Sequence, residues 1–449
     1  MNQPLLFPKW EVNPSADDLI YSLLNKGLSL CQEAENFRIQ LLNTCAVRLR
    51  DILDHMVVPE SMVPRSEFLA HGWIVDETDG NVLRNTAGLF PAILSGQHFA
   101  IAFKVEHVRD FVKTHRLSVT VEGKAYAPFQ RAKVWQNDLV SFWVVQRNGS
   151  LAFEAHDPSD EQLRLSRIHL QTFRSRRRQF NDPGEGFDYT DKIVQKAVAD
   201  LDQHWACDLF LRAEREFWMT RNYAGRVQKS RQDQMGIGWA NQDHHTYDSS
   251  RTWFHRNIKV LETLGFVCRE RFYAGADAGW GSQILEQPVI GSIIFTDIDL
   301  SPEELEGDFA HNSIPELPYM RRAGLWTALH GESMLDAGLN HLECMFDQKK
   351  FREQFHQLGI QMMNPFSNFP HLYQELTVGE WWPVDPAKVD ALEKQGLITQ
   401  EQAEDFRLNG AIGSHFENLE RNQGYKGFNQ PGIDGVLRII DPRKNLVEA

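Results

Sequence analysis

The sequence has few cysteines, no long apolar run and a deficit of positive charge, and each shortage excludes a class of protein. Its five cysteines are scattered along 449 residues without a C-x-x-C pair, which favours reduced thiols over a disulfide framework or a structural zinc site. No run approaches the roughly 18 apolar residues that a membrane span needs, and residues 1–15 lack the apolar stretch of a secretory signal. The net charge of −14 disfavours binding to nucleic acids and anionic membranes. We therefore expect a cytoplasmic protein.

Several motifs of common enzyme families are also missing. Neither a phosphate-binding loop of the form G-x-x-x-x-G-K-[ST] nor a G-x-S-x-G nucleophile turn occurs. The string Gly236-Ile-Gly238 lacks the third glycine and the strand–helix context of a dinucleotide-binding fingerprint. The chemistry must therefore come from other residue patterns.

Length and changes in composition predict three regions. A chain of 449 residues exceeds what one hydrophobic core usually supports. We expect an N-terminal α/β region over residues 1–175, a linker and helical connector over 176–238, and a C-terminal domain over 239–449.

The N-terminal region changes from helical to strand-like patterning near residue 99. Apolar residues at three- and four-residue spacing, such as Ile20, Leu24 and Leu28, predict helical structure over 16–60. An Asn-Gly pair between two apolar runs predicts a hairpin turn at 148–149. The expected elements from there are strands at 99–105, 117–121, 139–145 and 151–154, with a helix over 106–114. This β-α-β-β-β order would make residues 85–160 a degenerate copy of a module found further on.

The C-terminal half shows the β-α-β-β-β order twice. The first round consists of a strand at 244–247, a helix over 252–264 and strands at 266–272, 281–286 and 290–298. The second consists of a strand at 341–346, a helix over 348–358, an insertion over 364–410 with a helix near 386–395, and a closing strand at 413–421. A last helical segment is expected over 432–440. Paired modules of this kind would line one cavity with inward-facing strand residues.

Three short strings in this half each place a metal-ligand side chain on a predicted strand. They are Gln242-Asp-His-His245, Gly338-Leu-Asn-His-Leu342 and His415-Phe-Glu-Asn-Leu-Glu-Arg421. Two histidines and one carboxylate from separate strands form the facial triad that holds Fe(II) and leaves coordination positions open. His244, His341 and Glu417 are the candidates, and they predict a non-haem iron site.

At these strings the chain resembles the vicinal-oxygen-chelate superfamily. It resembles 4-hydroxyphenylpyruvate dioxygenases and, more distantly, 2-oxoadipate dioxygenase/decarboxylases. Gly338-Leu-Asn-His-Leu342 is similar to their Gly-Val-Gln-His-Ile, and Glu417-Asn-Leu-Glu-Arg421 to their Glu-x-x-Gln-Arg. Gly279-Trp-Gly-Ser282 resembles a strand that contacts substrate, and Gly424-Tyr-Lys-Gly-Phe428 resembles the segment before a helix that covers the site. The likeness spans roughly residues 239–440.

The resemblance implies an α+β fold with tandem modules and an Fe(II) dioxygenase that oxidatively decarboxylates a 2-oxo acid with O₂. It implies that His244, His341 and Glu417 bind the metal and carry the catalysis, and that Ser282 and Phe428 contact the substrate. The helix over 432–440 would act as a lid. A homo-oligomer is compatible with this interpretation. The alternatives are another metal enzyme of the same fold, such as an extradiol ring-cleaving enzyme, and a non-catalytic binding protein.

Several neighbouring residues compete for the ligand positions. His245 follows His244 and would point to the opposite face of a strand, because side chains alternate. Glu343, two residues after His341, would face the same cavity. Glu420 would lie on the face opposite Glu417, with His415 on the same face as Glu417. Asp243 would orient an imidazole as a hydrogen-bond acceptor or cap a turn.

Overall fold

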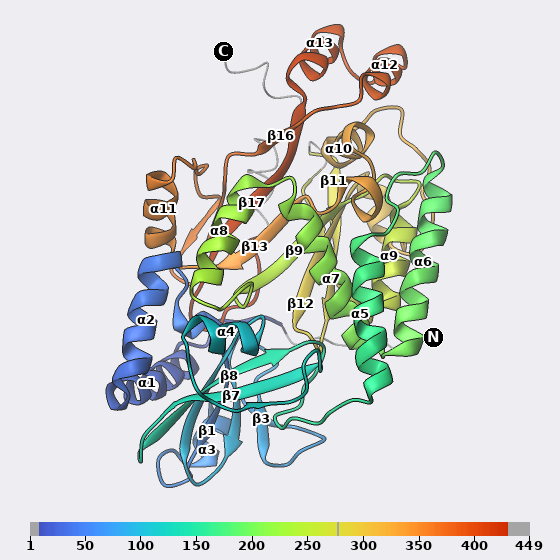
Figure 1. Cartoon of the computed structure of the whole chain (residues 1–449). Helices are drawn as coiled ribbons and strands as arrows, with labels where there is room; N and C mark the ends of the chain where they lie inside the picture. The colour runs from blue at the N-terminus through green and yellow to red at the C-terminus, as the bar shows by residue number, and fades with distance from the viewer. Residues whose placement is uncertain (1–8, 276–277, 430–449) are drawn as a thin grey trace.

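The computed structural model describes residues 9–275 and 278–429, which form two mixed β-sheets with helices around them (Figure 1). The first sheet has the strand order β2-β3-β4-β1-β5-β8-β7-β6. The second has the order β10-β11-β12-β9-β13-β17-β15-β14, with β16 paired to β17. The two orders have the same pattern, which is the first indication that the halves of the chain are built alike.

Each sheet consists of two β-α-β-β-β units joined edge to edge. Within a unit the first strand pairs in parallel with the last, as β1 does with β4 and β9 with β12. The units meet through antiparallel pairs, β1 with β5 and β13 with β9. Parallel pairing requires a crossover, and the single helix of each unit supplies it.

The first sheet contains units one and two. Unit one consists of β1 (Leu53–Val58), α3 (Arg65–Ala70), β2 (Ile74–Val75), β3 (Val82–Arg84) and β4 (Ala92–Ser95). Unit two consists of β5 (Phe99–Lys104), α4 (Val108–Thr114), β6 (Val121–Glu122), β7 (Phe129–Gln136) and β8 (Val140–Arg147). Two helices, α1 (Pro14–Leu30) and α2 (Gln32–Cys45), precede them and cover this sheet with an aromatic core around Phe37 and Phe103.

The second sheet contains units three and four. Unit three consists of β9 (Gln242–Asp248), α9 (Phe254–Thr263), β10 (Val267–Tyr273), β11 (Trp280–Gln287) and β12 (Ser292–Asp299). Unit four consists of β13 (His341–Met345), α11 (Gln348–Gln357), β14 (Ser367–Phe369), β15 (Leu372–Leu376) and β17 (Ala411–Arg421), with an insertion of β16 (Glu380–Trp382), α12 (Pro386–Lys394) and α13 (Gln400–Asn409) before β17. Between the units lies α10 (Arg322–His330).

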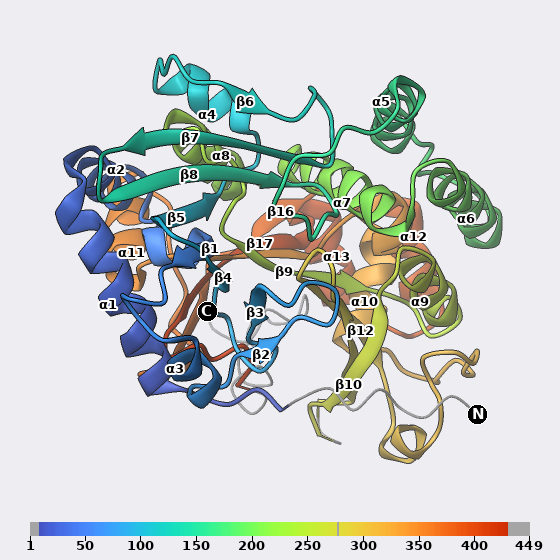
Figure 2. The ribbon, with the colours of Figure 1, turned by 90° about the horizontal axis from the view of Figure 1, so that it is seen from below.

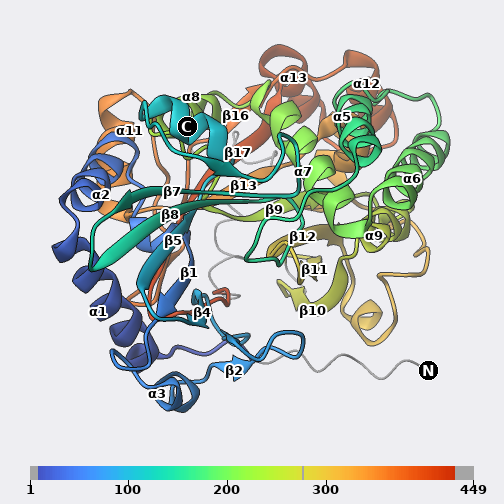
Figure 3. The ribbon, with the colours of Figure 1, turned by 60° about the horizontal axis from the view of Figure 1, so that its bottom comes forward.

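Four helices connect the sheets and cover the outer face of the second one. They are α5 (Asp160–Arg174), α6 (Pro183–Asp200), α7 (Gln203–Met219) and α8 (Tyr223–Gln234). Local sequence explains their starts: Ser159 and Gln162 form a reciprocal capping box, and Asp182 caps a helix that begins with Pro183. Figures 2 and 3 show α1 and α2 on one side of the molecule and α5 and α6 on the other.

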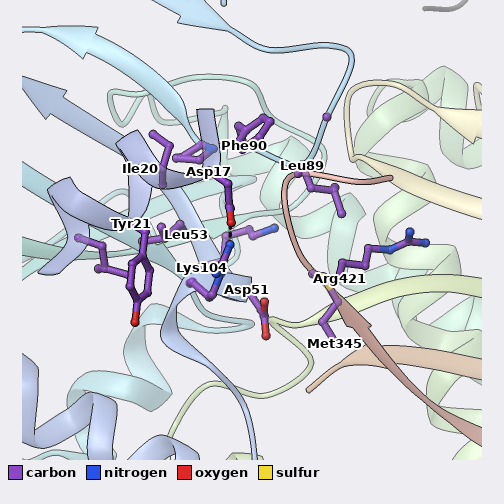
Figure 4. A pocket seen from close by; sticks show the side chains of 15 residues that line it. Asp17, Ile20, Tyr21, Asp51, Leu53, Leu89, Phe90, Lys104, Met345 and Arg421 are labelled. Atoms are coloured by element: carbon purple, nitrogen blue, oxygen red, sulfur yellow. Dashed lines mark hydrogen bonds and ion pairs between the residues drawn. The ribbon is translucent and has the colours of Figure 1, made fainter. Parts of the chain in front are cut away.

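The segment after β17, which includes Gln423 and Gly424, joins the second sheet to the N-terminal half through backbone hydrogen bonds. The backbone N–H groups of Asn13 and Leu89 donate to the carbonyls of Gln423 and Gly424. A cavity of about 160 Å³ lies at this junction, with Ile20 and Tyr21 on one side and Arg421 on the other (Figure 4). The end of β17 is therefore fixed by contacts with the N-terminal half of the chain.

The predicted α+β class and the tandem units of the C-terminal half are confirmed, and the N-terminal half requires corrections. Residues 53–58, inside the range predicted as helical, form β1, so two complete units replace the single degenerate one. Of residues 117–121 only Val121 is in a strand. Residues 151–154 form no strand, since Arg147 donates to the carbonyls of Ser150 and Ala152, and β8 pairs with β7 instead.

Helix α13 in the insertion was also not predicted from the sequence.

Among the described residues, no helix combines the length and the apolar character needed to cross a membrane.

Replacing Phe103 with alanine should destabilise the N-terminal half strongly. Phe103 is fully buried against Phe37, Phe111 and Trp135, so its loss leaves a cavity worth about 3–5 kcal/mol. Phe369→Ala is the matched control, because Phe369 is 48% exposed and should cost about 0.5 kcal/mol or less. Urea denaturation measures both; equal losses would contradict the core assignment.

Candidate metal centre

The inner face of the second sheet encloses a small buried cavity that contains all three predicted ligands. Its volume is about 40 Å³. The strands contribute its polar wall and apolar side chains close it; the lining residues are His244, Thr246, Trp280, Phe295, Asp297, His341, Glu343, Phe366, Gln374, Leu376, Glu417 and Phe428. A cavity of this size accommodates an ion and its immediate ligands rather than a bound metabolite.

The strand register explains why these side chains meet. Glu343 on β13 lies opposite His244 on β9 and beside Glu417 on β17, so the three form one row across the sheet. His341 stands two residues before Glu343 and therefore faces the same side. Gly338 begins this approach with φ of 78°, and a side chain there would come within 2.8 Å of Phe217.

The distances within the row suit a shared cation. His244 Nε2 lies 3.4 Å from Glu343 Oε1, and His341 Nδ1 lies 3.8 Å from the same oxygen. One donor atom each from His244, Glu343 and Glu417 lies within 4.8 Å of the other two. His244 and Glu417 of the predicted triad thus converge with Glu343, whereas His341 lines the same cavity without belonging to this group. Which of the four bind the metal stays a prediction.

An arginine–aspartate pair orients His244. Its Nδ1 lies 2.8 Å from Asp243 Oδ1, and Arg421 donates to both oxygens of that carboxylate at 2.9 and 3.1 Å. Burial opposes ionisation of Asp243, but the Arg421 charge and the His244 hydrogen bond hold its pKa well below the usual range. With Nδ1 bonded to a carboxylate, Nε2 is left to face the cavity as a ligand.

The two glutamates carry the electrostatic signature of an ion site. Burial, together with the neighbouring Glu417 charge, raises the pKa of Glu343 well above its ordinary value. Burial likewise raises the pKa of Glu417 to about 8, although Gln374 Nε2 donates to it at 3.0 Å. Two adjacent buried carboxylates repel each other unless a proton or a cation lies between them.

The histidines fit the same interpretation. Burial and the adjacent His415 lower the pKa of His341 well below its ordinary value, which keeps the ring neutral, as metal coordination requires. Among the described residues, neither His341 Nε2 nor Glu343 Oε2 has a hydrogen-bond partner. Buried polar atoms normally have one, so each of these two atoms is free to bind an ion.

The other residues considered as metal ligands do not line the cavity. His245 is fully buried on the opposite face of β9, where its Nε2 is 3.5 Å from Arg215 Nη1. His415 donates from Nδ1 to the Thr377 carbonyl, and its ring centre is 5.1 Å from that of His341. Glu420, outside the cavity, accepts from Arg48 at 2.8 Å and from the Gln348 backbone at 2.7 Å.

The two predicted substrate contacts lie at different distances from the cavity, and whether either touches a substrate stays a prediction. Ser282 does not line the cavity, because its hydroxyl donates to the Thr296 carbonyl at 3.0 Å within the sheet. Phe428 does line it, with its ring centre 5.0 Å from that of His244 and 4.6 Å from that of Phe295. The helix predicted over 432–440 lies outside the described residues.

The sequence interpretation also missed part of the wall. Asp297 binds Arg322, which donates at 2.7 Å to Asp297 and at 2.6 Å to Asp248. Arg322 comes from α10, in the connection between the units, and no strand pattern could have indicated it. Gln374 lies on β15, whose short strand in the insertion was not recognised.

The first sheet repeats the arrangement of aspartate, histidine and arginine around His244, but it lacks the carboxylates of the cavity row. His55 Nδ1 is 2.6 Å from Asp54, Arg147 pairs with Asp54, and Phe153 lies edge-on 5.0 Å from His55. The register places Ala102 opposite His55 and Trp143 beside Ala102, at the positions held by Glu343 and Glu417 in the second sheet. The N-terminal half is thus a structural copy that lacks the carboxylates.

Comparisons with known proteins give distant structural likenesses and no match in sequence. No family model and no curated protein matches the sequence. A solved variant of 4-hydroxymandelate synthase from Streptomyces coelicolor matches over 75% of this chain and 95% of its own, with 11% identity and a TM-score of 0.30. Methylmalonyl-CoA epimerase from Mycobacterium tuberculosis matches over 40% of this chain and 88% of its own, with 11% identity and a TM-score of 0.22.

The paired units decide the fold. They have the β-α-β-β-β order that the resemblance to the vicinal-oxygen-chelate superfamily implies, and it occurs in both halves of the chain. Similarity this low carries no information about reaction or substrate, which must be argued from the site itself.

Replacing Glu417 should abolish metal binding, whereas replacing Glu420 should not. Glu417→Ala removes a carboxylate from the cavity row, whereas Glu420→Ala removes a partly buried ion pair with Arg48 and an acceptor for one backbone N–H, both outside the cavity. Metal content after loading with Fe(II) or Mn(II) measures the difference, with thermal melting as the check on folding. Equal metal content in the two variants would refute the assignment.

Proposed function

We propose that the protein is an Fe(II)-dependent dioxygenase that oxidatively decarboxylates a 2-oxo acid. The observation that carries this proposal is the buried cavity at which His244, His341 and Glu417 meet from β9, β13 and β17. Fe(II) bound there would supply open positions at which a 2-oxo acid chelates and O₂ is reduced. The balanced outcome is loss of CO₂ and transfer of the two oxygen atoms to the remaining substrate.

The protein's own part is to orient the ligands and to exclude water. Arg421 and Asp243 fix the His244 ring, and Gln374 fixes the Glu417 carboxylate. Phe428 packs edge-on against His244 and fills the space in which a substrate would lie. Since a cavity of about 40 Å³ cannot hold a 2-oxo acid beside a metal, Phe428 must move when the substrate enters.

Glu343 favours a second candidate, a metal enzyme that transfers protons without redox chemistry. Its Oε1 lies nearer to His244 Nε2 than to His341 Nδ1, at 3.4 Å against 3.8 Å. If all four side chains bind, an octahedral metal keeps two open positions, enough for a chelating substrate but not for O₂ as well. The reaction would then be proton transfer on a chelated substrate.

The two candidates predict different responses to 2-oxo acids. The anaerobic Fe(II) protein should develop a visible metal-to-ligand charge-transfer band with a 2-oxo acid from a panel of varied side chains, because chelation through carboxylate and keto oxygens produces it. Admission of O₂ should then release one CO₂ per O₂ consumed, as measured with labelled substrate and an oxygen electrode. Chelation without O₂ uptake across the panel would refute the dioxygenase and favour the second candidate.

Glu343→Gln tests the number of ligands directly. In the dioxygenase, His244, His341 and Glu417 suffice, so this variant should keep its Fe(II) and most of its turnover. In the four-ligand enzyme it should lose at least about tenfold in metal affinity, as expected when a charged ligand is removed. Thermal stability should not fall, because the substitution removes one of two adjacent buried charges. His341→Gln is the matched control.

A further inference from the structure

A buried arginine lies behind the metal-bearing sheet without a counter-charge at ion-pair distance. Arg215 on α7 is 5% exposed. Its one hydrogen-bond contact among the described residues is that of Nη1 with His245 Nε2, at a long 3.5 Å, and its Nε has no partner. The described carboxylates form no ion pair with it. Glu106 and Asp208 interact with its charge only from beyond ion-pair distance, so the guanidinium has no carboxylate bonded to it among the described residues.

This arrangement differs from that of the other buried arginines of the chain. Arg176 is paired with Glu214 at 2.9 Å, and Arg421 with Asp243 at 2.9 Å. An arginine cannot shed its proton to escape burial, and an unpaired buried charge is costly. A buried guanidinium without an ion pair in the protein alone is a position at which a bound anion would be stabilised.

Arg215 lines a cavity large enough for a small organic molecule. The cavity, about 570 Å³, is lined by residues of α4, which packs against the first sheet, and of α7 and α8, which lie over the second sheet (Figure 1). Its volume is in the range of ordinary ligand pockets. Trp239 also lines it, and its indole Nε1 is buried without a hydrogen-bond partner among the described residues. The wall therefore includes two side chains that each have a buried nitrogen without a hydrogen-bond partner among the described residues.

Most of the acidic groups around the cavity are already neutralised. Glu106 pairs with Lys229 at 3.2 Å, and Lys229 also bonds Asp233 at 2.5 Å. Glu216 is held by Arg174 at 2.6 Å and by Arg212 at 3.3 Å. The remaining charged groups of the wall are Asp110, Lys113 and Arg215 itself.

We propose that this cavity binds a small organic anion through Arg215, with a phosphate or carboxylate group as the recognised part. A planar guanidinium with a free edge matches either oxyanion in a bidentate pair. The site is separate from the metal centre but adjoins it, since Arg215 touches His245 and His245 follows His244 on β9. Binding at the two sites is thereby coupled through one strand, and any coupling is reciprocal.

Phenyl phosphate and benzoate test the proposal, because they share a ring and differ in the anionic group. One of them should raise the melting temperature of the full-length, metal-loaded protein in a concentration-dependent way at constant ionic strength, and phenol should not. The response of each identifies the oxyanion. Arg215→Met should bind at least about tenfold more weakly by calorimetry, as expected from loss of a charge-assisted pair.

Two controls separate binding from structure. Arg164→Met makes the same substitution at an exposed helix position paired only with Glu161, and its response should equal that of the wild type. Without ligand, Arg215→Met should be at least as stable as the wild type, because it removes an unpaired charge; Arg215→Lys, which keeps the charge, should fold and bind more weakly. No thermal shift with either anion, or an undiminished shift in Arg215→Met and Arg215→Lys, would overturn the proposal.

Discussion

The pairing of β9 with β13 and of β13 with β17 is the constraint on which the site depends. It sets His244, Glu343 and Glu417 in one row, with His341 one step away on the same face. A shift of one residue in either pairing would turn the carboxylates toward the helices and the apolar residues toward the cavity. The parallel pairs that close units three and four hold the register, because each links strands separated by a whole unit.

The row concentrates negative charge where the protein has little water to screen it. Glu343 and Glu417 are buried side by side, and the surrounding groups relieve only part of their repulsion. Gln374 and Thr246 donate one hydrogen bond each to this pair. Contacts from the N-terminal half fix the end of β17, and through Arg421 they also fix Asp243 and His244. The first sheet thus serves the metal centre although its own residues do not line the cavity.

The sequence predicted the features that depend on local residue patterns. It did not predict the features that depend on contacts between segments far apart in the chain. Histidines and a glutamate between apolar residues on predicted strands were enough to find His244, His341 and Glu417. Strand alternation also placed Glu343 in the cavity, but its distance from His244 depends on the pairing of two strands, which no single strand encodes. The hairpin expected at 148–149 does not form. Arg147 donates hydrogen bonds to the carbonyls of Ser150 and Ala152, which a returning strand would otherwise use for pairing. Ser282 lies on the strand that was predicted for it, but its hydroxyl donates a hydrogen bond to the Thr296 carbonyl of the neighbouring strand.

The copy in the first sheet shows which residues make the second sheet a metal centre. Asp54, His55 and Arg147 reproduce Asp243, His244 and Arg421, and the ring of Phe153 lies over Arg147 at 4.8 Å as that of Phe428 lies over Arg421 at 4.9 Å. An oriented histidine is therefore not sufficient for a site. With Ala102 and Trp143 in the row, the first sheet has no carboxylate to attract a cation, and its inner face is filled by side chains. The difference between the halves lies in the carboxylates, because Glu343 and Glu417 stand on a frame that both halves share and have no counterpart in the first sheet.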